Sequence, residues 1–344
     1  MGGIGGRIVG LGGGIGASRL WRLLAQTAGA ENMTLVVNTA DDLWQFGLKI
    51  CPDIDTTLYA LSGRQDTQRG WGVKDESFRC MTALRGLSRD VWFNLGDLDL
   101  ATHLYRTGLM RDGTGLVAVT ARLASALGVT ARVLPMSEDE VATLIETADG
   151  RLLHYEEYLV RYQCGPQMRR VHFDGLDRAE AAPGVLAAIG SADLIVLAPS
   201  NPVASILPIL GLPGVREALR QRRERVTAVA PIVSGVPIVD PDEYRRAASR
   251  AALLAAAGVP ATAAGVAHLY RDICSRFIYD ASDCGEAGPI AAAGPEPVRA
   301  ELLLHCGASP ASLLAAILHG LPGGVSRSEP SRPGCLSSSS KRGP

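Results

Sequence analysis

Lysine is almost missing from this chain of 344 residues: only Lys49, Lys74 and Lys341 occur among 34 basic residues. An excess of charge of one sign is missing as well, because 35 acidic residues leave a formal net charge of −1. A chain without surplus positive charge lacks the general electrostatic footprint of nucleic-acid-binding and membrane-surface proteins. We therefore expect no nucleic-acid partner, and we expect charge recognition to be confined to a local site.

Paired cysteines and long apolar runs are also lacking. The seven cysteines are scattered and form no Cys-x-x-Cys pair, which argues against a disulfide framework and against a zinc site. The N-terminal apolar run has two or three residues, too short for a secretory signal. No later run reaches the roughly 18 apolar residues of a membrane span. We expect a soluble cytoplasmic protein that has no membrane partner.

What the chain does have is a regular alternation of short apolar runs with stretches of helical periodicity, the pattern of βα units in a parallel sheet. The sequence predicts an α/β, Rossmann-like fold with a mostly parallel sheet flanked by helices. The runs expected to form strands are 7–9, 33–40, 131–135, 192–202, 225–233 and 276–280. Helices are expected over 17–29, from about 204, over 241–258 and around 263–274, and a β-hairpin over 143–155.

Two inserts and a tail interrupt this pattern. Residues 62–130 are expected to form a mostly helical insert and residues 155–190 an irregular one, and the two would be the walls of a cleft. From residue 323 the chain is polar and rich in Ser, Gly and Pro, which predicts a disordered tail over 323–344. The sequence thus predicts a single α/β domain over 1–322, followed by that tail.

A glycine-rich turn follows the first expected strand, in the stretch "IVGLGGGIGASRL". Glycines let the backbone approach oxygen atoms closely, and the start of the next helix offers free N–H groups, so this turn predicts a phosphate cradle. The spacing Gly12-x-Gly14-x-x-Ala17 fits a dinucleotide-binding fingerprint that ends in alanine, while a P-loop is excluded because no Gly-Lys-Ser/Thr follows. A turn that needs positive φ angles would explain the glycines equally well.

Four aspartates, Asp41, Asp42, Asp53 and Asp55, lie within fifteen residues directly behind the second expected strand. Ligands bind at the carboxyl ends of strands in open α/β sheets. Carboxylates there, next to a phosphate cradle, are suited to hold Mg²⁺ against a diphosphate and to take a proton from an attacking hydroxyl. The alternative is helix capping by Asp41 and a solvated turn around Asp53 and Asp55; the presence of all four favours a site.

Two further stretches carry polar groups at helix starts. In "NLGDLDLATHLYRT", Asp97 and Asp99 open a helix that places His103 on the same face as Asp99. In "APSNPVASI", Ser200 and Asn201 lie between a buried strand and a helix, a second position suited to an anion. Ordinary helix capping explains both stretches as well.

Taken in order, these motifs resemble those of the 2-phospho-L-lactate transferase family, which acts in the biosynthesis of the deazaflavin coenzyme F-420. The similarity covers roughly residues 7 to 285 and includes "GGGIGASRL", "VVNTADDLW", "CPDIDTTLY", "RGWGVKDESF", "LPMSED", "LAPSNPVASI" and "VAPIVSG". It implies transfer of a phospho-hydroxyacid group (2-phospho-L-lactate, phosphoenolpyruvate or phosphoglycerate type) from a guanosine-diphosphate-activated donor. The acceptor would be the ribityl hydroxyl of the deazaflavin FO (7,8-didemethyl-8-hydroxy-5-deazariboflavin), with release of GMP. The resemblance also implies Mg²⁺ as cofactor and a homodimer.

The resemblance further implies roles for individual residues. Asp42 and Asp55 would be catalytic and would hold the metal ion, with Asp53 beside them. The glycines would wrap the donor phosphates, Ser200 and Asn201 would belong to the nucleotide side, and other positions would line the acceptor. The implied substrate-binding set is Gly13, Gly14, Gly16, Asn38, Thr39, Asp53, Thr56, Trp71, Asp97, His103, Ser200 and Asn201.

One position departs from the family pattern. Family members usually carry a basic residue between the two aspartates where this chain has Leu98. The change removes a contact to the ring, phosphate or acid of a substrate and bears on acceptor affinity. Arg69, Lys74 or Arg106 are the residues that could replace it.

Two other readings compete with the transferase. Sugar-nucleotide-binding regulators of the same superfamily share the glycine loop and a similar "ADD", but they tend to continue with a run of glycine and serine. Here Leu43 and Trp44 follow, and then "PDIDT", which favours the transferase. A dinucleotide-dependent oxidoreductase would need an acid at the end of the second strand. Asp41 or Asp42 could serve, but "PDIDT" and "APSNP" would remain unexplained.

Overall fold

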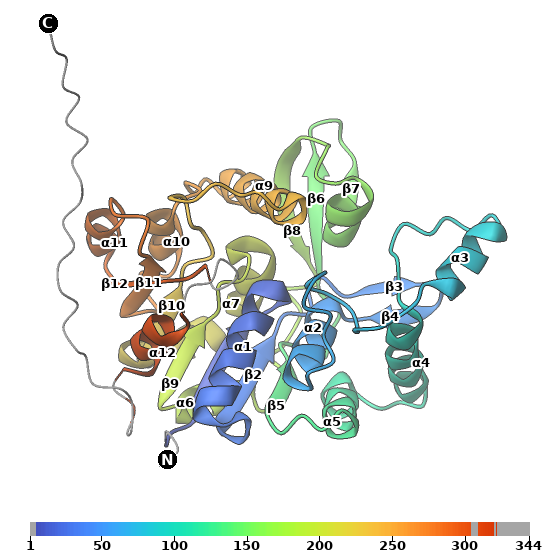
Figure 1. Ribbon diagram of the computed structural model, residues 1–344, viewed down its shortest axis with the longest axis horizontal. Coiled ribbons are helices and arrows are strands. Elements are labelled where there is room, and N and C mark those ends of the chain that lie inside the picture. Colours follow the sequence, from blue (N-terminus) through green and yellow to red (C-terminus); the bar gives the residue numbers. More distant parts are fainter. Residues whose placement is uncertain (1–4, 304–308, 320, 322–344) are drawn as a thin grey trace, which may run out of the picture.

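A seven-stranded sheet forms the centre of the chain (Figure 1). The computed structural model describes residues 5–303, 309–319 and 321. Neighbouring strands of this sheet all run parallel, in the spatial order β12-β11-β10-β9-β1-β2-β5. The strands are β1 (Ile8–Gly12), β2 (Met33–Val37), β5 (Arg132–Pro135), β9 (Leu194–Leu197), β10 (Val226–Val229), β11 (Arg276–Asp280) and β12 (Glu296–Ala300). Strands β1, β9 and β10 are buried along their whole length, as expected when helices cover both faces of a parallel sheet.

Helices cover the two faces of the sheet and enclose a separate apolar cluster on each. The first face carries α1 (Gly14–Ala28), α2 (Pro52–Leu61), α5 (Leu116–Ala126) and α12 (Ala311–Leu318). The second carries α6 (Val185–Ser191), α7 (Leu207–Gly211), α8 (Val215–Gln221), α9 (Pro241–Ala256), α10 (Ala263–Leu269) and α11 (Ala287–Ala293). In α1, Leu20, Trp21 and Leu24 recur at helical spacing and are buried against the sheet, which explains why this segment is a helix that packs on its apolar face.

Smaller elements lie beyond the carboxyl edge of the sheet, toward the top and right of Figure 1. A hairpin pairs β3 (Leu43–Gln45) with β4 (Leu48–Ile50), and a three-stranded antiparallel sheet has the order β7-β6-β8. Its strands are β6 (Ala142–Thr147), β7 (Leu152–His154) and β8 (Met168–Asp174). The helices α3 (Arg79–Gly86) and α4 (Asp97–Arg111) lie beside the hairpin, and short 3-10 or π turns occupy Ala30–Asn32, Glu157–Arg161, Pro202–Ile206 and Arg223–Arg225.

The strand order reverses at β1. From β1 the chain proceeds to β2 and β5 on one side, while β9 to β12 extend the sheet on the other side. Because the connections leave β1 and β9 in opposite directions, the carboxyl ends of these two strands form the switch point at which open α/β sheets bind ligands in a crevice. We call this position the crevice. The glycine loop follows β1, and Pro199–Asn201 follow β9, so these two loops form the floor of this crevice.

The α/β, Rossmann-like fold with a mostly parallel sheet is confirmed, and the 62–130 insert contains α3, α4 and α5. Two local expectations were wrong, and three strands were not expected. Helix α1 begins at Gly14, earlier than residue 17; the 155–190 insert is not irregular throughout, because β8 pairs with β6; and the β3–β4 hairpin and β12 were not expected. The tail predicted over 323–344 lies outside the described residues.

Within the described ranges, none of the helices is by itself long and apolar enough to cross a membrane. One pair of helical segments, Pro202–Gly211 and Val215–Gln221, meets the length and composition requirements only when taken together, and it is bent by 89°.

Candidate functional site

Ser200 joins the two loops that form the floor of the crevice. Its Oγ accepts the N–H of Gly13 at 3.0 Å and donates to the Gly13 carbonyl oxygen at 2.8 Å. Ser200 is buried, so both bonds are shielded from water. The "APSNP" stretch and the glycine loop are therefore in direct contact, although the two residues lie 187 positions apart.

The glycines of the loop are required by close contacts. A Cβ atom at Gly13 would lie 1.9 Å from Oδ2 of Asp53, and one at Gly16 would lie 2.2 Å from the Pro199 carbonyl oxygen. Any side chain at these two positions would displace either the Asp53 carboxylate or the loop after β9. The carboxylate of Asp53 also interacts with the backbone of Gly14, at the start of α1. The loop thus brings the backbone of α1 against one of the predicted site aspartates.

Asn38 connects two of the four aspartates. It follows β2, and its Nδ2 donates to Oδ2 of Asp41 and to Oδ2 of Asp53, each at 3.0 Å. Its Oδ1 accepts the N–H of Ala40 at 3.1 Å, which fixes the orientation of the amide. Pro52 at the first position of α2 starts that helix and places Asp53 in its first turn. Residues from β2 and α2 thereby meet at one point above the glycine loop.

Among the four aspartates, Asp42 has neither oxygen within ordinary hydrogen-bond distance of a donor, although the nearby Cys51 thiol favours its charged form. Asp42 is 8 % exposed, and its nearest cation is the Nζ of Lys49, 3.7 Å from Oδ2. Burial raises the pKa of Asp42 to about 6, against the opposing effect of Lys49. The hydroxyl of buried Thr39 also lacks a partner. Unpartnered buried oxygens are costly, so this point of the chain is suited to a ligand that supplies positive charge.

The neighbouring carboxylates show the same electrostatic strain. Burial raises the pKa of Asp53 to about 7, with a further contribution from the charge of Asp42, while the bond from Asn38 opposes it. Burial and the charge of Asp53 raise the pKa of Asp41 well above its usual range. Glu156, on the turn after β7, has its pKa raised to about 8 by burial and by Asp53. Several acids that resist ionisation together form a site that a divalent cation would neutralise.

Asp55 belongs to a second, adjoining network. Arg106 of α4 is fully buried, and both of its terminal nitrogens donate to the Asp55 carboxylate, from Nη1 to Oδ2 at 3.1 Å and from Nη2 to Oδ1. Nη1 also lies 3.2 Å from Nδ1 of His103. A guanidinium can only donate, so Nδ1 accepts and the imidazole hydrogen belongs on Nε2, which faces Asp99 Oδ2 at 3.3 Å. Tyr59 donates its hydroxyl to the other oxygen of Asp99 at 2.6 Å.

Asp55, Asp99 and His103 have ligand atoms that lie within 4.8 Å of one another, a spacing that could hold a metal ion. The guanidinium of Arg106 already contacts two of the three groups and supplies the positive charge there. The two predicted metal ligands are therefore in different situations. Asp42 offers unpartnered oxygens, whereas both oxygens of Asp55 accept hydrogen bonds from Arg106.

Other predicted site residues lie at the edge of this centre and have structural contacts. Asn201 caps the turn that starts at Pro202, because its Oδ1 accepts the N–H groups of Val203 and Ala204. Asp97 accepts the Ser77 hydroxyl and the N–H groups at the start of α3, so it fastens α3 to α4. Thr56 is partly buried on α2.

Trp71 lies in the loop between α2 and α3, with its ring 6.4 Å from that of Phe78 in an edge-to-face arrangement. The guanidinium of Arg69 lies 5.2 Å from both ring centres and pairs with Asp66. Leu98 is 51 % exposed at the start of α4. Arg106 is paired with Asp55, and Arg69 is paired with Asp66. Neither arginine is therefore free to replace a basic residue at position 98.

Sequence reasoning did not assign Lys49 or Glu156 to the site. Lys49 is 7 % exposed, which is unusual for lysine, and the turn of the β3–β4 hairpin brings it back to Asp42. Glu156 is brought to the aspartates because β6 starts beside them, with Thr143 N–H bonded to the Ala40 carbonyl at 2.7 Å, and β7 returns to the same place. The rarity of lysine in this chain was the one sequence signal that pointed to Lys49.

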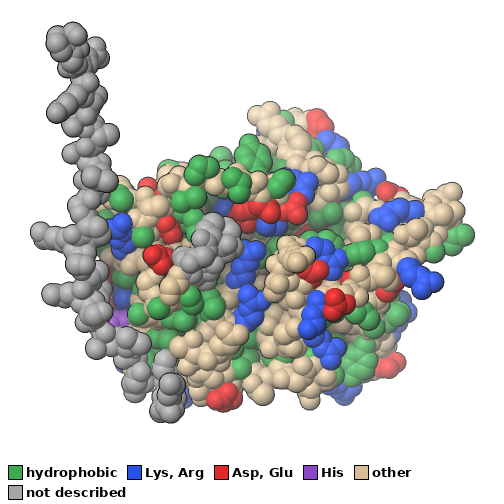
Figure 2. All heavy atoms as spheres, in the orientation of Figure 1, with side chains coloured by type: hydrophobic (Ala, Val, Ile, Leu, Met, Phe, Trp, Pro, Cys, Tyr) green, Lys and Arg blue, Asp and Glu red, His purple; other side chains and the backbone are tan. Residues whose placement is uncertain are grey.

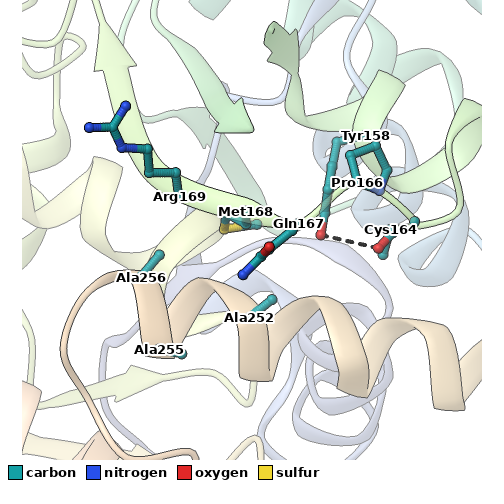
Figure 3. A pocket seen from close by; sticks show the side chains of 10 residues that line it. Tyr158, Cys164, Pro166, Gln167, Met168, Arg169, Ala252, Ala255 and Ala256 are labelled. Carbon is teal, nitrogen blue, oxygen red and sulfur yellow. Dashed lines mark hydrogen bonds between the residues drawn. The ribbon is translucent and has the colours of Figure 1, made fainter. Parts of the chain in front are cut away.

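A separate groove of about 390 Å³ lies between α9 and the segment that leads into β8 (Figure 3). Small side chains of α9, including Ala252 and Ala255, form one wall, and Cys164 lies on the other, near the hydroxyl of Tyr158. Burial raises the pKa of the Cys164 thiol, which makes it a poor nucleophile. This groove lacks the converging charged groups of the crevice.

Comparison with known proteins identifies the family of this chain. A family model described as 2-phospho-L-lactate transferase CofD matches residues 8–268. A phosphoenolpyruvate transferase of Streptomyces griseus is 41% identical over 293 residues, covering 84% of this chain and 90% of that protein. A 2-phospho-L-lactate transferase of Methanosarcina mazei is 36% identical over 292 residues, covering 85% and 93%. A crystal structure of protein BH3568 from Bacillus halodurans, with 20% identity and a TM-score of 0.55 over 88% of this chain and 93% of that one, shares the fold.

Proposed function

Because the chain belongs to the 2-phospho-L-lactate transferase CofD family, a family of transferase enzymes, we propose that it transfers a phospho-hydroxyacid group in the biosynthesis of the deazaflavin coenzyme F-420. The group is a phospho-hydroxyacid carried by a guanosine-diphosphate-activated donor, and the acceptor is the ribityl hydroxyl of FO. The new bond joins the acceptor oxygen to the phosphorus of the phospho-hydroxyacid. The bond from that phosphorus to the bridging oxygen breaks, and GMP leaves.

The observation that supports this proposal most directly is the unpartnered carboxylate of Asp42 in the crevice, next to the glycine loop. Attack by an alcohol on a diphosphate needs neutralisation of the phosphate charge, alignment of the two substrates and a weak base. A buried carboxylate with a pKa of about 6 can accept the hydroxyl proton near neutral pH. Asp55, held by Arg106, is the second proposed catalytic residue, and its fixed orientation would position the acceptor side.

The same residues fit Mg²⁺. Neither oxygen of Asp42 has a hydrogen-bond partner, and its nearest cation is Lys49 at 3.7 Å. Burial raises the pKa values of Asp41, Asp42 and Asp53, so an added cation would stabilise their charged forms. We propose that Asp42 and Asp55 hold the ion; Asp55 would share its oxygens between the ion and Arg106, since each carboxylate oxygen has two acceptor sites. A bound Mg²⁺ would neutralise the charge that develops on the diphosphate.

The remaining predicted residues are proposed to serve two sides of the site, the nucleotide donor and the acceptor. Gly14 and Gly16 at the start of α1, together with Ser200 and Asn201, are proposed to face the nucleotide donor, because helix N–H groups favour anions. His103 and Trp71 are proposed to line the acceptor side, toward α4 and the loop after α2. The enzyme is proposed to act as a cytoplasmic homodimer, and light scattering of the purified chain measures the subunit number.

A turnover assay tests the proposal. Purified protein is incubated with FO and a guanylylated phospho-hydroxyacid, with Mg²⁺ or with a chelator, and product and GMP are measured. We expect both products only with Mg²⁺ present, none from Asp42→Asn, and unchanged turnover from Asp177→Asn, a matched change at an exposed carboxylate. Nucleotide binding without turnover would indicate a regulator instead. Competition among phospholactate, phosphoenolpyruvate and phosphoglycerate donors identifies the acid, since such donors differ by a methyl, methylene or hydroxyl group.

A further inference from the structure

A group of arginines comes from two helices, α1 and α9. Two arginines of α9 pair with one carboxylate, Glu243 in the first turn of that helix, and a third arginine acts on it from a longer distance. Arg246 donates to Glu243 Oε2 from Nε at 3.2 Å and from Nη2 at 3.1 Å, and Nη2 of Arg250 lies 3.7 Å from Oε1. Arg19 of α1 makes no ion pair with this carboxylate; burial lowers the pKa of Arg19, and the charge of Glu243 opposes that larger effect. In Figure 2, basic side chains lie over the upper part of α1, and acidic and basic ones meet along the facing edge of α9.

The arginines outnumber the acids that face them. Arg22 of α1 and Asp240, the N-cap of α9, are the other charged groups whose charges act on Arg19. Four guanidinium groups thus face two carboxylates. Burial lowers the pKa of Arg19 and of Arg250, and the charge of Arg246 adds to this effect on both. A cluster with surplus positive charge in partly buried surroundings is stabilised by an added anion.

This arginine cluster flanks the loops that form the floor of the crevice. Arg19 follows Gly14 by five residues on α1. On the other side, Arg250 follows Ser249, whose Oγ lies 3.2 Å from the hydroxyl of Tyr155, and that hydroxyl accepts a hydrogen bond from Asn201 at 3.4 Å. Helix α9 is thereby linked to the loop after β9 through Ser249 and Tyr155, and Arg19 lies on the helix that the glycine loop begins.

We propose that Arg19, Arg246 and Arg250 form a clamp for the phosphates of the nucleotide donor, and that Glu243 occupies the clamp until a phosphate displaces it. The proposal rests on the proposed function, which supplies a guanosine-diphosphate-activated donor. A phosphate offers more negative charge and more acceptor oxygens than one carboxylate, and guanidinium groups bind it in a two-pronged manner.

The exposures of the side chains fit an exchange of this kind. The Glu243 side chain is 30% exposed and can turn into water, whereas Arg250 is 16% exposed and stays in place. The two charged groups then have complementary tasks. The acidic group around Asp42 attracts a cation, and the arginine cluster receives the phosphates, so the diphosphate lies between opposite charges.

Calorimetric titration with GDP in buffer without Mg²⁺ tests the clamp, with guanosine as the uncharged probe. Arg250→Ala and Arg19→Ala are expected to weaken GDP binding about tenfold or more, as for loss of a charge-assisted hydrogen bond, and to leave guanosine binding unchanged. Glu243→Gln is expected to tighten GDP binding severalfold, because the competing charge is gone. A misfolded variant would bind GDP more weakly, so tighter binding by Glu243→Gln cannot result from misfolding.

Glu217 and Arg220 supply the matched controls, because they form the same three-residue-spaced ion pair on α8. Glu217→Gln and Arg220→Ala are expected to leave GDP binding as in the parent. If Glu243→Gln binds GDP no tighter than the parent, the clamp is refuted, and turnover of FO by the parent would show that the proposed function still stands. If Glu243→Gln tightens GDP binding while the parent transfers nothing to FO, the clamp is supported and the proposed function fails.

Discussion

Replacing Asp42 by asparagine should make the folded chain less sensitive to alkaline pH. The folded-state pKa of Asp42 is about 6 because burial disfavours its charged form, while the unfolded value is near 3.8. At pH values between these two pKa values, Asp42 is therefore protonated in the folded chain and ionised in the unfolded chain. The contribution of Asp42 to the unfolding free energy is fully present below the unfolded pKa, and it is lost as the pH rises through the folded pKa of about 6.

The size of this effect follows from the shift. About two pKa units correspond to about 3 kcal/mol of unfolding free energy, of which about 2 kcal/mol falls between pH 4 and pH 8. An asparagine does not titrate. As the pH rises from 4 to 8, the unfolding free energy of Asp42→Asn should therefore fall by about 2 kcal/mol less than that of the parent. The comparison across pH cancels the constant cost of the amide, including any change in its contact with Lys49.

Urea unfolding of parent and variant at pH 4 and pH 8, without divalent ions, measures this difference. Parallel losses in the two proteins would refute the reasoning, and Asp177→Asn, at an exposed carboxylate, should behave as the parent. Mg²⁺ adds a second readout at pH 8. A ligand at 100 times its dissociation constant stabilises a folded protein by about 2.7 kcal/mol, and this gain should be present in the parent and absent from Asp42→Asn.

Two further substitutions test the packing behind the site. Arg106→Ala leaves the buried Asp55 carboxylate without its partner and should lower the unfolding free energy by about 3–5 kcal/mol; a loss below 1 kcal/mol in urea unfolding would contradict the fully buried pair. Gly13→Ala places a methyl group 1.9 Å from the Asp53 oxygen, so thermal unfolding should show a lower midpoint and turnover should fall. Gly190→Ala, where a Cβ meets open space, should show neither effect.

Local patterns in the sequence were sufficient for the βα framework. Apolar runs such as 194–197 are buried strands because a sheet covered on both faces needs uninterrupted apolar residues, and this requirement is visible in the residues themselves. The glycine loop and the two aspartate pairs were also recognisable. Elements whose pairing is distant or whose runs are short, such as β8 and β12, were missed because nothing local marks a strand that is defined by its partner.

Only the tertiary structure decided which aspartate is free. The sequence by itself presents Asp42 and Asp55 as equivalent carboxylates near one turn, but α4 carries Arg106 from 51 residues away onto Asp55 and leaves Asp42 with unpartnered oxygens. The arginine cluster has the same origin, because Arg19 and Glu243 lie 224 positions apart in the sequence and their charges interact only in the folded chain. Electrostatic character depends on burial and on neighbours distant in sequence, and these are properties of the folded chain.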